Sequence, residues 1–501
     1  MENRYFLGLD NGGTMTKAAV LDLERGEIIA SAARKTEMLM PAPGRTEKNL
    51  DDVWQANLDM IRKVLADTGL SGDAVAGVAL TGTGNGLYLA DADGRQTYNG
   101  IVSTDTRADN YAAECRKSGR HRTNLPKTMQ SIWGGQPPML LQWLRDNDPE
   151  VLRRTRYVFL LKDLLRFRLT GEAFLEKTEM SGAHLLNQTT GLPDDGILRN
   201  FDLLDLRDKI PPLRDSSDCC GTVTRAAAAA CGLREGTPVY GGTMDITACA
   251  IASGVVDETL DSAIGGTWSI NQYISRRPVI EPELFMDSLY CIPGWHLVCD
   301  ASPTGAGNLE WFIGTVLAEQ SRRCAAEGTS IYDHCADMIG KTAPDSPVVF
   351  VPFIFSNHVN GAGSACFLGM RAVHGLEHMI RAVYEGVCFS HRYHFERLRR
   401  FGDVAEKIRL TGGAAKSPMW LQMFADILGR PVETVHGEEL GIMGTLMSAL
   451  VGSGACGDYG EAVARLVRVK QRVLPNPELH ATYEEKYARY KAAVESGILT
   501  A

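Results

Sequence analysis

Residues 5–23, YFLGLDNGGTMTKAAVLDL, place a glycine turn between two hydrophobic runs and decide the first element of the fold. Such runs on either side of a glycine turn predict a β-hairpin. The same pattern, a strand, a Gly-Gly-Thr turn and a second strand, returns at residues 259–273, TLDSAIGGTWSINQY. Two copies of one hairpin predict two related domains, which we place at residues 1–254 and 255–501.

The segments between and after these hairpins alternate between helical and strand patterns. Asp51–Leu65 carries apolar residues at helical spacing, and Ala74–Leu80 reads as a buried strand. Further amphipathic helices are expected around 376–400 and 417–428, and a closing helix after Pro475. Strands alternating with amphipathic helices are typical of α/β proteins, so we expect an α/β fold.

Composition excludes several classes of function. The 501 residues carry a net charge of -9 and no long Lys/Arg run, which argues against nucleic acid as a partner. No apolar run approaches the roughly 20 residues of a membrane span. The 12 cysteines include no CxxC pair and no signal peptide is recognisable, so we expect reduced thiols and a cytoplasmic protein. Glycine accounts for 51 of the 501 residues, which exceeds its usual share of about 7%. The excess suggests that backbone approaches a ligand closely.

The first candidate site is the segment GLDNGGTMTK, residues 8–17. Glycines let several backbone N–H groups converge on a phosphate, to which two threonine hydroxyls and a lysine could add. The predicted phosphate contacts are Gly12, Gly13, Thr14, Thr16 and Lys17. Asp10, at the strand end, could hold a hydrated Mg²⁺. The alternative is an ordinary hairpin turn with a solvent-facing Asp and Lys.

The second candidate is Asp245, in PVYGGTMDITACAIASG, residues 238–254. It follows a strand and a glycine pair and precedes a small, apolar, helical segment. An aspartate at a helix start can simply cap the helix. It can equally accept the proton of a substrate hydroxyl, as phosphoryl transfer to an alcohol requires.

Two further segments allow a ligand reading and a structural one. The turn Gly412-Gly413-Ala414 could let an adenosine lie against backbone, but a doubly wound crossover gives the same pattern. Asp105 and Arg107 could grip sugar hydroxyls or form a surface ion pair. Trp133 could face a sugar or lie in the core.

Taken together, these segments resemble the FGGY family of carbohydrate kinases over essentially the whole chain. The most specific is ACFLGMRAVHGLEHMIRAVYE, residues 365–385, which fits the family's second signature. GGQPPMLLQWLRDN fits the first signature less well, because Leu140 stands where a lysine is usual. Within the family the chain most resembles the L-xylulose kinase branch of pentulose kinases, through residues 99–108, 301–312 and 384–391.

This resemblance implies a two-domain fold of the actin/hexokinase/Hsp70 type. Each domain would have a mixed five-stranded sheet, and ATP and Mg²⁺ would bind in the cleft between the domains. Matched residue by residue, Asp245 corresponds to the catalytic base, also near the metal, and Asp10 to the acidic residue near Mg²⁺. The other implied contacts are Gly12, Gly13, Thr14, Thr16, Lys17, Gly266, Thr267, Gly307, Gly412, Gly413 and Ala414 for ATP, and Asn85, Asp105, Arg107 and Trp133 for the sugar.

The expected reaction is transfer of the γ-phosphoryl of ATP to a hydroxyl of a small ketose, most closely L-xylulose. Gly84-Asn85 and Ser103 depart from the residues usual in D-xylulose kinases, and both departures fall in the expected sugar pocket. D-xylulose, ribulose and erythritol remain alternative substrates. A partner-moving ATPase of the actin or Hsp70 type is a further alternative. A homodimer is expected, with no nucleic acid or membrane partner.

Overall fold

The computed structural model describes residues 4–356, 363–402 and 405–496, and the chain forms two units. The first unit contains Met1–Val256, Ser275–Leu297 and Gly437–Val467, and the second contains Asp257–Ile274, Val298–His436 and Arg468–Ala501. The chain first passes from the first unit to the second after Val256, close to the boundary expected at 254/255. The expected division into two halves missed the two later segments that belong to the first unit.

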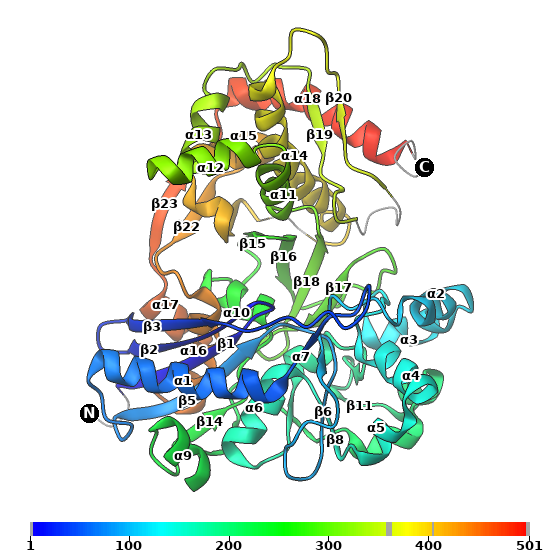
Figure 1. Ribbon diagram of the computed structural model, residues 1–501, viewed down its shortest axis with the longest axis vertical. Helices are drawn as coiled ribbons and strands as arrows, with labels where there is room; N and C mark the ends of the chain where they lie inside the picture. The colour runs from blue at the N-terminus through cyan, green and yellow to red at the C-terminus, as the bar shows by residue number, and fades with distance from the viewer. Residues whose placement is uncertain (1–3, 357–362, 403–404, 497–501) are drawn as a thin grey trace. The chain divides into compact units, whose positions relative to one another are not determined.

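The first unit is built on a six-stranded sheet with the order β13-β14-β5-β1-β2-β3 (Figure 1). Its strands are β1 (Tyr5–Asn11), β2 (Met15–Asp22), β3 (Glu27–Lys35), β5 (Val75–Gly82), β13 (Cys219–Thr222) and β14 (Pro238–Tyr240). The hairpin expected from the opening stretch is confirmed, because β1 and β2 pair antiparallel, with Asp10 opposite Lys17. Strand β1 is parallel to β5, and β5 is parallel to β14.

Helices cover both faces of this sheet, and the alternation along β1 decides what each face meets. Asn11 points to α1, where its amide nitrogen donates to Asn57 Oδ1 at 3.1 Å. Gly8 points the opposite way, and a Cβ there would lie 2.4 Å from a methyl of Ile442 on α16. The close approach of α16 (Leu440–Gly452) therefore requires glycine at position 8. Helix α1 (Leu50–Thr68) confirms the helix expected at 51–65.

The remaining elements of the first unit are short. Its other helices are α2 (Asp109–Lys117), α3 (Arg120–Thr128), α4 (Pro137–Asn147), α5 (Pro149–Arg154), α6 (Leu161–Thr170), α7 (Lys177–Ser181), α8 (Asp195–Asn200), α9 (Arg225–Cys231), α10 (Asp245–Ala252) and α17 (Tyr459–Leu466). Small strand pairs join β4 (Glu47–Lys48) to β7 (Gly100–Ile101), β6 (Tyr88–Ala90) to β8 (Tyr157–Phe159), β9 (Leu175–Glu176) to β12 (Leu213–Arg214), and β10 (Leu186–Asn187) to β11 (Leu192–Pro193).

The second unit repeats the strand plan of the first. The sheet has seven strands in the order β17-β18-β16-β15-β21-β22-β23, in which β17 is Met286–Leu289. The other six strands follow the plan of the first sheet. They are β15 (Leu260–Gly265), β16 (Ser269–Ser275), β18 (His296–Ser302), β21 (Lys407–Thr411), β22 (Val432–Val435) and β23 (Val469–Val473). As in the first unit, the central strand is antiparallel to its hairpin partner and parallel to the strand on its other side. The predicted two-domain fold is confirmed, and its main sheets have six and seven strands where five were expected in each.

The helices of the second unit are α11 (Gly307–Thr315), α12 (Ala318–Glu327), α13 (Ile331–Ile339), α14 (Leu376–Leu398), α15 (Pro418–Leu428) and α18 (Pro477–Glu495). Of these, α14, α15 and α18 are the three that the sequence predicts. A small hairpin pairs β19 (Val349–Val351) with β20 (Cys366–Leu368). Ser417 caps α15 through a bond from Trp420 N–H, and Pro418 is its first residue, the start that the sequence signals.

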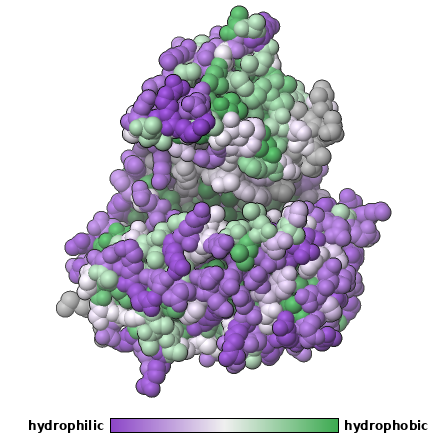
Figure 2. Space-filling view, viewed as in Figure 1, coloured by the Kyte–Doolittle hydropathy of each residue, from purple (hydrophilic) through white to green (hydrophobic). Residues whose placement is uncertain are grey.

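The side chains on the visible face of the first unit are mostly hydrophilic, with apolar residues scattered among them (Figure 2). The apolar side chains of its core, such as Leu7, Leu9 and Ile61, are fully buried. Among the described residues, no helix combines the length and apolar character that a membrane crossing needs.

Candidate active site

Asp10 and Asp245 lie near one another in the first unit, each at the end of a sheet element. Asp10 is the next-to-last residue of β1, and Asp245 is the first residue of α10, which follows β14. Because β1, β5 and β14 run parallel, their carboxyl ends lie at one edge of the sheet. Ligands of open α/β sheets bind at this edge.

The glycine pair before Asp245 is required by the backbone. Gly242 has a φ of 74°, and a Cβ there would lie 1.9 Å from the carbonyl oxygen of Leu80. A Cβ on Gly241 would lie 2.5 Å from the carbonyl oxygen of Asp215. The chain therefore passes closely between two backbone segments before it delivers Asp245 to the sheet edge.

Asp245 does not cap α10, since the N-cap residue is Met244 and the carboxylate lies at the first helical position. Ile246 N–H donates to Asp245 Oδ1 at 2.7 Å. Burial raises the pKa of Asp245 to about 6, while backbone N–H donors from Ile246 and Gly84 oppose that rise. A carboxyl with a pKa near neutrality can exchange a proton readily at neutral pH.

Asp10 is perturbed further, and the cause includes Asp245. Burial and the negative charge of Asp245 raise the pKa of Asp10 to about 7, while the nearby Lys17 lowers it. Helix α16 approaches closely here, since a Cβ on Gly441 would lie 3.3 Å from Asp10 Oδ2. A buried carboxylate whose proton affinity is raised by a second carboxylate marks a place where positive charge is stabilised.

The donor set fits a hydrated Mg²⁺. In the described ranges, no group of three or more His, Cys, Asp or Glu side chains could hold a metal by itself. Mg²⁺ characteristically binds through one or two carboxylates together with water and substrate phosphates. Asp10 and Asp245 supply such carboxylates, and at Asp10 the negative charge of Asp245 outweighs the positive charge of Lys17.

The Gly12-Gly13-Thr14 turn of the first hairpin is open enough to meet a phosphate. Gly12 N–H donates to Met15 O at 3.0 Å, which closes the turn. A Cβ placed on Gly13 would meet no atom within 4 Å, and Thr14 is exposed. The turn thus presents free backbone, as the phosphate prediction requires.

A lysine that sequence reasoning missed lies behind this turn. Lys48 is 1% exposed, and its Nζ donates to Gly12 O at 2.9 Å and to Thr36 Oγ1 at 2.9 Å. Burial lowers its pKa to about 8. Lys48 therefore fixes the turn and adds positive charge beneath it. A charged residue inside a short strand, β4, would have been the available signal.

Two of the predicted phosphate contacts are engaged elsewhere. The Thr16 side chain is buried, and its hydroxyl donates to Asn11 Oδ1 at 3.0 Å, so we correct its assignment to a structural role. Lys17 Nζ donates to Glu439 Oε2 at 2.8 Å. Glu439, just before α16, was not predicted, because it follows Lys17 by more than 400 residues.

In the second unit, the two predicted nucleotide turns lie against each other. Gly412 has a φ of 84°, and a Cβ there would lie 2.8 Å from Gly265 O. A Cβ on Gly265 would in turn lie 2.7 Å from the Cβ of Ala414. Contacts this close leave room only for glycine, as a shared backbone surface for a ligand would require.

The second turn also meets the start of α11. Ala306 N–H donates to Gly266 O at 2.7 Å, and a Cβ on Gly307 would lie 3.0 Å from Thr267 Cγ2. Thr267 and Gly413 are exposed, while Gly307 is buried beneath the turn. The structure thus brings together all the residues that were predicted for ATP in this unit.

Asn85 lies near Asp245 in a conformation that is rare for residues other than glycine. Its φ is 62°, it is 7% exposed, and its Oδ1 lacks a hydrogen-bond partner within the described chain. The neighbouring Gly84 donates its N–H to Asp245, and a Cβ there would lie 3.0 Å from Met244 Cε. A buried side-chain oxygen without a hydrogen-bond partner indicates a ligand-binding position.

Trp133 is half-buried and lies beside the same segment. Gly86 N–H donates to Gly135 O at 3.0 Å, which ties the two loops together. A Cβ on Gly135 would lie 2.7 Å from the Trp133 ring and 1.9 Å from Ser103 O. Asn85, Ser103 and Trp133, which are distant in sequence, thus belong to one loop cluster.

The Asp105–Arg107 pair requires a correction. Arg107 Nε donates to Asp105 Oδ1 at 2.8 Å, and Thr46 N–H donates to Asp105 Oδ2 at 2.7 Å. Arg107 Nη2 also donates to Glu47 Oε1 at 2.6 Å. The Asp105 and Arg107 side chains are 0% and 1% exposed. The pair is neither a surface ion pair nor open to a sugar, so we assign it to supporting the loop.

Two sequence profiles match the chain. The N-terminal domain of the FGGY family of carbohydrate kinases matches residues 5–252, and the C-terminal domain of that family matches residues 262–453. The chain belongs to the FGGY family of carbohydrate kinases. It is therefore an enzyme of the phosphotransferase class with an alcohol group as acceptor. The second match extends into the segment Gly437–Val467, which completes the first unit.

Similar proteins of this family cover nearly the whole chain. A probable L-xylulose kinase from Pasteurella multocida is 34% identical, over 97% of this chain and 98% of its own length. An L-xylulose/3-keto-L-gulonate kinase from Escherichia coli is 33% identical, over 97% and 96% of the two chains. A ligand-bound xylulose kinase structure from Lactobacillus acidophilus is 20% identical, with a TM-score of 0.90 over 99% of this chain and 98% of that chain. The last comparison confirms the fold.

Proposed function

We propose that this FGGY kinase phosphorylates L-xylulose or a related pentulose at its terminal hydroxyl, with ATP as donor and Asp245 as general base. The observation that carries the proposal is the position of Asp245. Its buried carboxyl, with a pKa of about 6, begins a helix at the carboxyl edge of the sheet, beside Asp10. The two L-xylulose kinases at 33–34% identity support the choice of sugar.

Asp245 would align the sugar hydroxyl and accept its proton as the phosphoryl group arrives. The transition state of such transfers is loose, so positioning and charge neutralisation supply most of the catalysis. With a pKa of about 6, Asp245 is mostly ionised at neutral pH yet basic enough to hold the proton afterwards. The backbone donor Ile246 N–H keeps the carboxylate oriented while it waits.

The remaining residues would hold the phosphates. The Gly12-Gly13-Thr14 turn would offer backbone to a phosphate, and Lys48 would add positive charge beneath it. Mg²⁺, held by Asp10 with Asp245 nearby, supplies charge neutralisation when it is bound. In the second unit, the turns at 265–267 and 412–414 would contact the nucleotide.

Asn85 and Trp133 would select the sugar. The unpaired Asn85 Oδ1 can accept a bond from a sugar hydroxyl, and the half-buried Trp133 can cover the apolar C–H side of a ketose. A site that hydrogen-bonds a hydroxyl strongly rejects analogues in which that hydroxyl is absent or misplaced. These contacts therefore discriminate between configurations, as selection among pentuloses demands.

A coupled ADP-release assay tests the proposal. The panel would contain L-xylulose, 3-keto-L-gulonate, D-xylulose, D- and L-ribulose and erythritol. We expect the highest kcat/KM for L-xylulose or 3-keto-L-gulonate, and negligible ADP release without sugar. A stronger response to erythritol or D-xylulose would refute the substrate, and fast sugar-independent hydrolysis would favour an ATPase.

Asp245→Asn tests the base. The amide cannot accept the proton, so kcat should fall by about 100-fold or more while sugar binding survives. Sugar binding would be followed by isothermal titration of the variant with L-xylulose. Near-normal turnover would show that another group is the base.

A further inference from the structure

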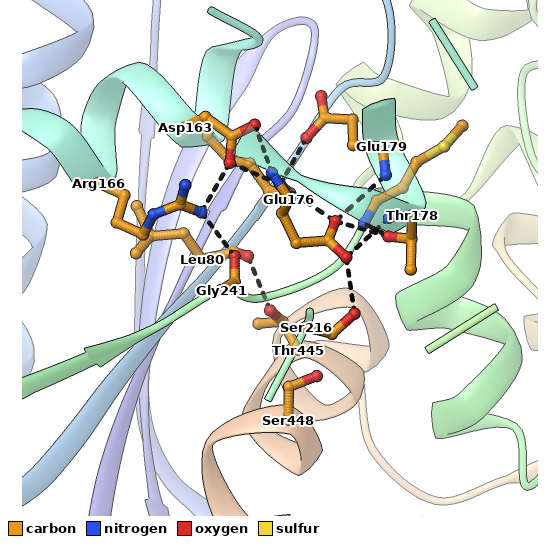
Figure 3. Close-up of polar contacts among 12 residues, drawn as sticks. Leu80, Asp163, Arg166, Glu176, Thr178, Glu179, Ser216, Gly241, Thr445 and Ser448 are labelled. Atoms are coloured by element: carbon orange, nitrogen blue, oxygen red, sulfur yellow. Dashed lines mark hydrogen bonds and ion pairs between the residues drawn. The ribbon is translucent and has the colours of Figure 1, made fainter. Parts of the chain in front are cut away.

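A buried cluster of charged side chains lies behind the loop that carries Asp245. It contains Lys162, Asp163 and Arg166 of α6 and Glu176, Thr178 and Glu179 at the start of α7, and each is at most 2% exposed (Figure 3). The mechanism above uses none of these residues. Burying five ionisable groups is costly unless each is paired, so the arrangement of their partners shows what the cluster stabilises.

Each carboxyl group of the cluster has a cation beside it. Lys162 Nζ lies 2.8 Å from Asp163 Oδ1, 3.3 Å from Glu176 Oε2 and 3.0 Å from Glu179 Oε2. Burial raises the pKa of Glu179, and the charge of Lys162 opposes that rise. The cluster is therefore an internal ion network of two cations and three carboxyl groups.

Two arms of this network reach the catalytic loop. Arg166 Nη1 bridges Asp163 Oδ1, at 2.7 Å, and the carbonyl oxygen of Gly241, at 2.9 Å. Thr178 Oγ1 donates to Glu176 Oε2 at 2.7 Å and accepts the N–H of Met244 at 3.0 Å. The bonds therefore hold the loop on both sides of Gly242-Thr243 and end one residue before Asp245.

A third arm holds the loop between these points. Ser216 Oγ donates to Glu176 Oε1 at 2.7 Å, and Ser216 O accepts the N–H of Gly242 at 3.0 Å. Glu176 thus connects to the loop through Thr178 and through Ser216, with one carboxylate oxygen for each (Figure 3). Among Arg166, Thr178 and Ser216, only Thr178 bonds through its side chain to Met244, the residue next to Asp245.

We propose that Thr178, oriented by Glu176, is a positioning residue that sets the place of the Asp245 carboxylate by holding Met244 N–H. The proposal rests on the proposed role of Asp245 as base. Without the hydroxyl, Met244 N–H is a buried donor with no acceptor, and the loop shifts to find another acceptor. The donors from Gly84 and Ile246 to Asp245 then lengthen, and the Asp245 carboxylate is misaligned.

The test compares Thr178→Val, which keeps the shape and removes the hydroxyl, with Thr178→Ser, which keeps the hydroxyl. Thr155→Val is the matched control, since Thr155 is also buried and its hydroxyl donates to Val151 O and pairs with the Thr97 hydroxyl. For each full-length variant, kcat and the KM for L-xylulose are measured with Mg-ATP, and unfolding is measured alongside.

Thr178→Val should lower kcat about 10- to 100-fold, with the KM for L-xylulose changed less than about 3-fold. Thr178→Ser should restore kcat. Thr155→Val should lose comparable stability and keep the wild-type kcat. A kcat of Thr178→Val that matches the kcat of Thr155→Val would overturn the proposal.

If Thr178→Val does not fold, Ser216→Ala tests the proposal in its place. It removes one bond to Glu176 and leaves Ser216 O in place, so a smaller fall in kcat with a nearly unchanged KM is expected, and an unchanged kcat overturns the proposal. Asp245→Asn is assayed in parallel. If it keeps turnover, the proposed function fails. If it loses turnover while Thr178→Val behaves as wild type, only the positioning role fails.

Discussion

Asp10→Asn should stabilise the ligand-free enzyme at alkaline pH while it abolishes turnover. The fold raises the pKa of Asp10 from an ordinary 3.8 to about 7, through burial and the charge of Asp245. The folded protein then binds the proton more tightly than the unfolded chain does. Stability from this group is therefore fully present at low pH and is lost as the pH rises from about 4 to about 7.

The magnitude follows from the size of this shift. About three pKa units correspond to about 4 kcal/mol in the free energy of unfolding, which is an upper value because the site keeps some solvent contact. Asparagine resembles the protonated acid and carries no charge. The variant should therefore exceed the wild type by about 2–4 kcal/mol at pH 8 and match it near pH 4.5.

Urea unfolding at a series of pH values measures this difference, with fluorescence as the probe and ligand absent. Asp208→Asn, which alters an exposed carboxylate of the same unit, is the control and should show no such pH-dependent gain. If Asp10→Asn gives no gain in the free energy of unfolding at pH 8, or the same gain at every pH, then ionisation of Asp10 does not destabilise the folded protein. The reasoning that places a cation beside it would then be refuted.

Two further substitutions test the loops around the site. Gly242→Ala should destabilise the first unit by more than about 3 kcal/mol, since its φ of 74° and the backbone carbonyl 1.9 Å from the new Cβ both oppose it. Thermal unfolding measures this, and a wild-type melting temperature would contradict it. Asp105→Asn should cost about 3–5 kcal/mol, because it leaves Arg107 buried with less compensation. Stability and kinetics should both be followed, since a rise in sugar KM without loss of stability would return Asp105 to the sugar site.

The repeated hairpin was the feature of the fold that sequence could predict best. Both Gly-Gly-Thr turns lie between strong hydrophobic runs, and local patterns of this kind determine local structure. The structure adds that both sheets share one strand order. The return of residues 437–467 to the first unit was not predictable, because which helix completes a sheet depends on packing between distant segments.

The errors in the site also have a physical cause. Thr16 and Lys17 are neighbours on a strand, so their side chains point to opposite faces, and both cannot meet one phosphate. Strand alternation could have excluded Thr16 in advance. Asp105 and Arg107 gave no such signal, because their burial comes from Glu47 and Thr46 on a separate segment.

Helix α16 has a consequence for synthesis of the chain on the ribosome. It covers Gly8 and Asp10 of β1, yet it begins at Leu440, after most of the second unit has been translated. Nascent chains fold from the amino terminus, domain by domain. One apolar face of the first sheet therefore stays uncovered until nearly all of the protein has left the ribosome. Truncation before residue 437 should therefore yield an aggregating product rather than an isolated amino-terminal domain.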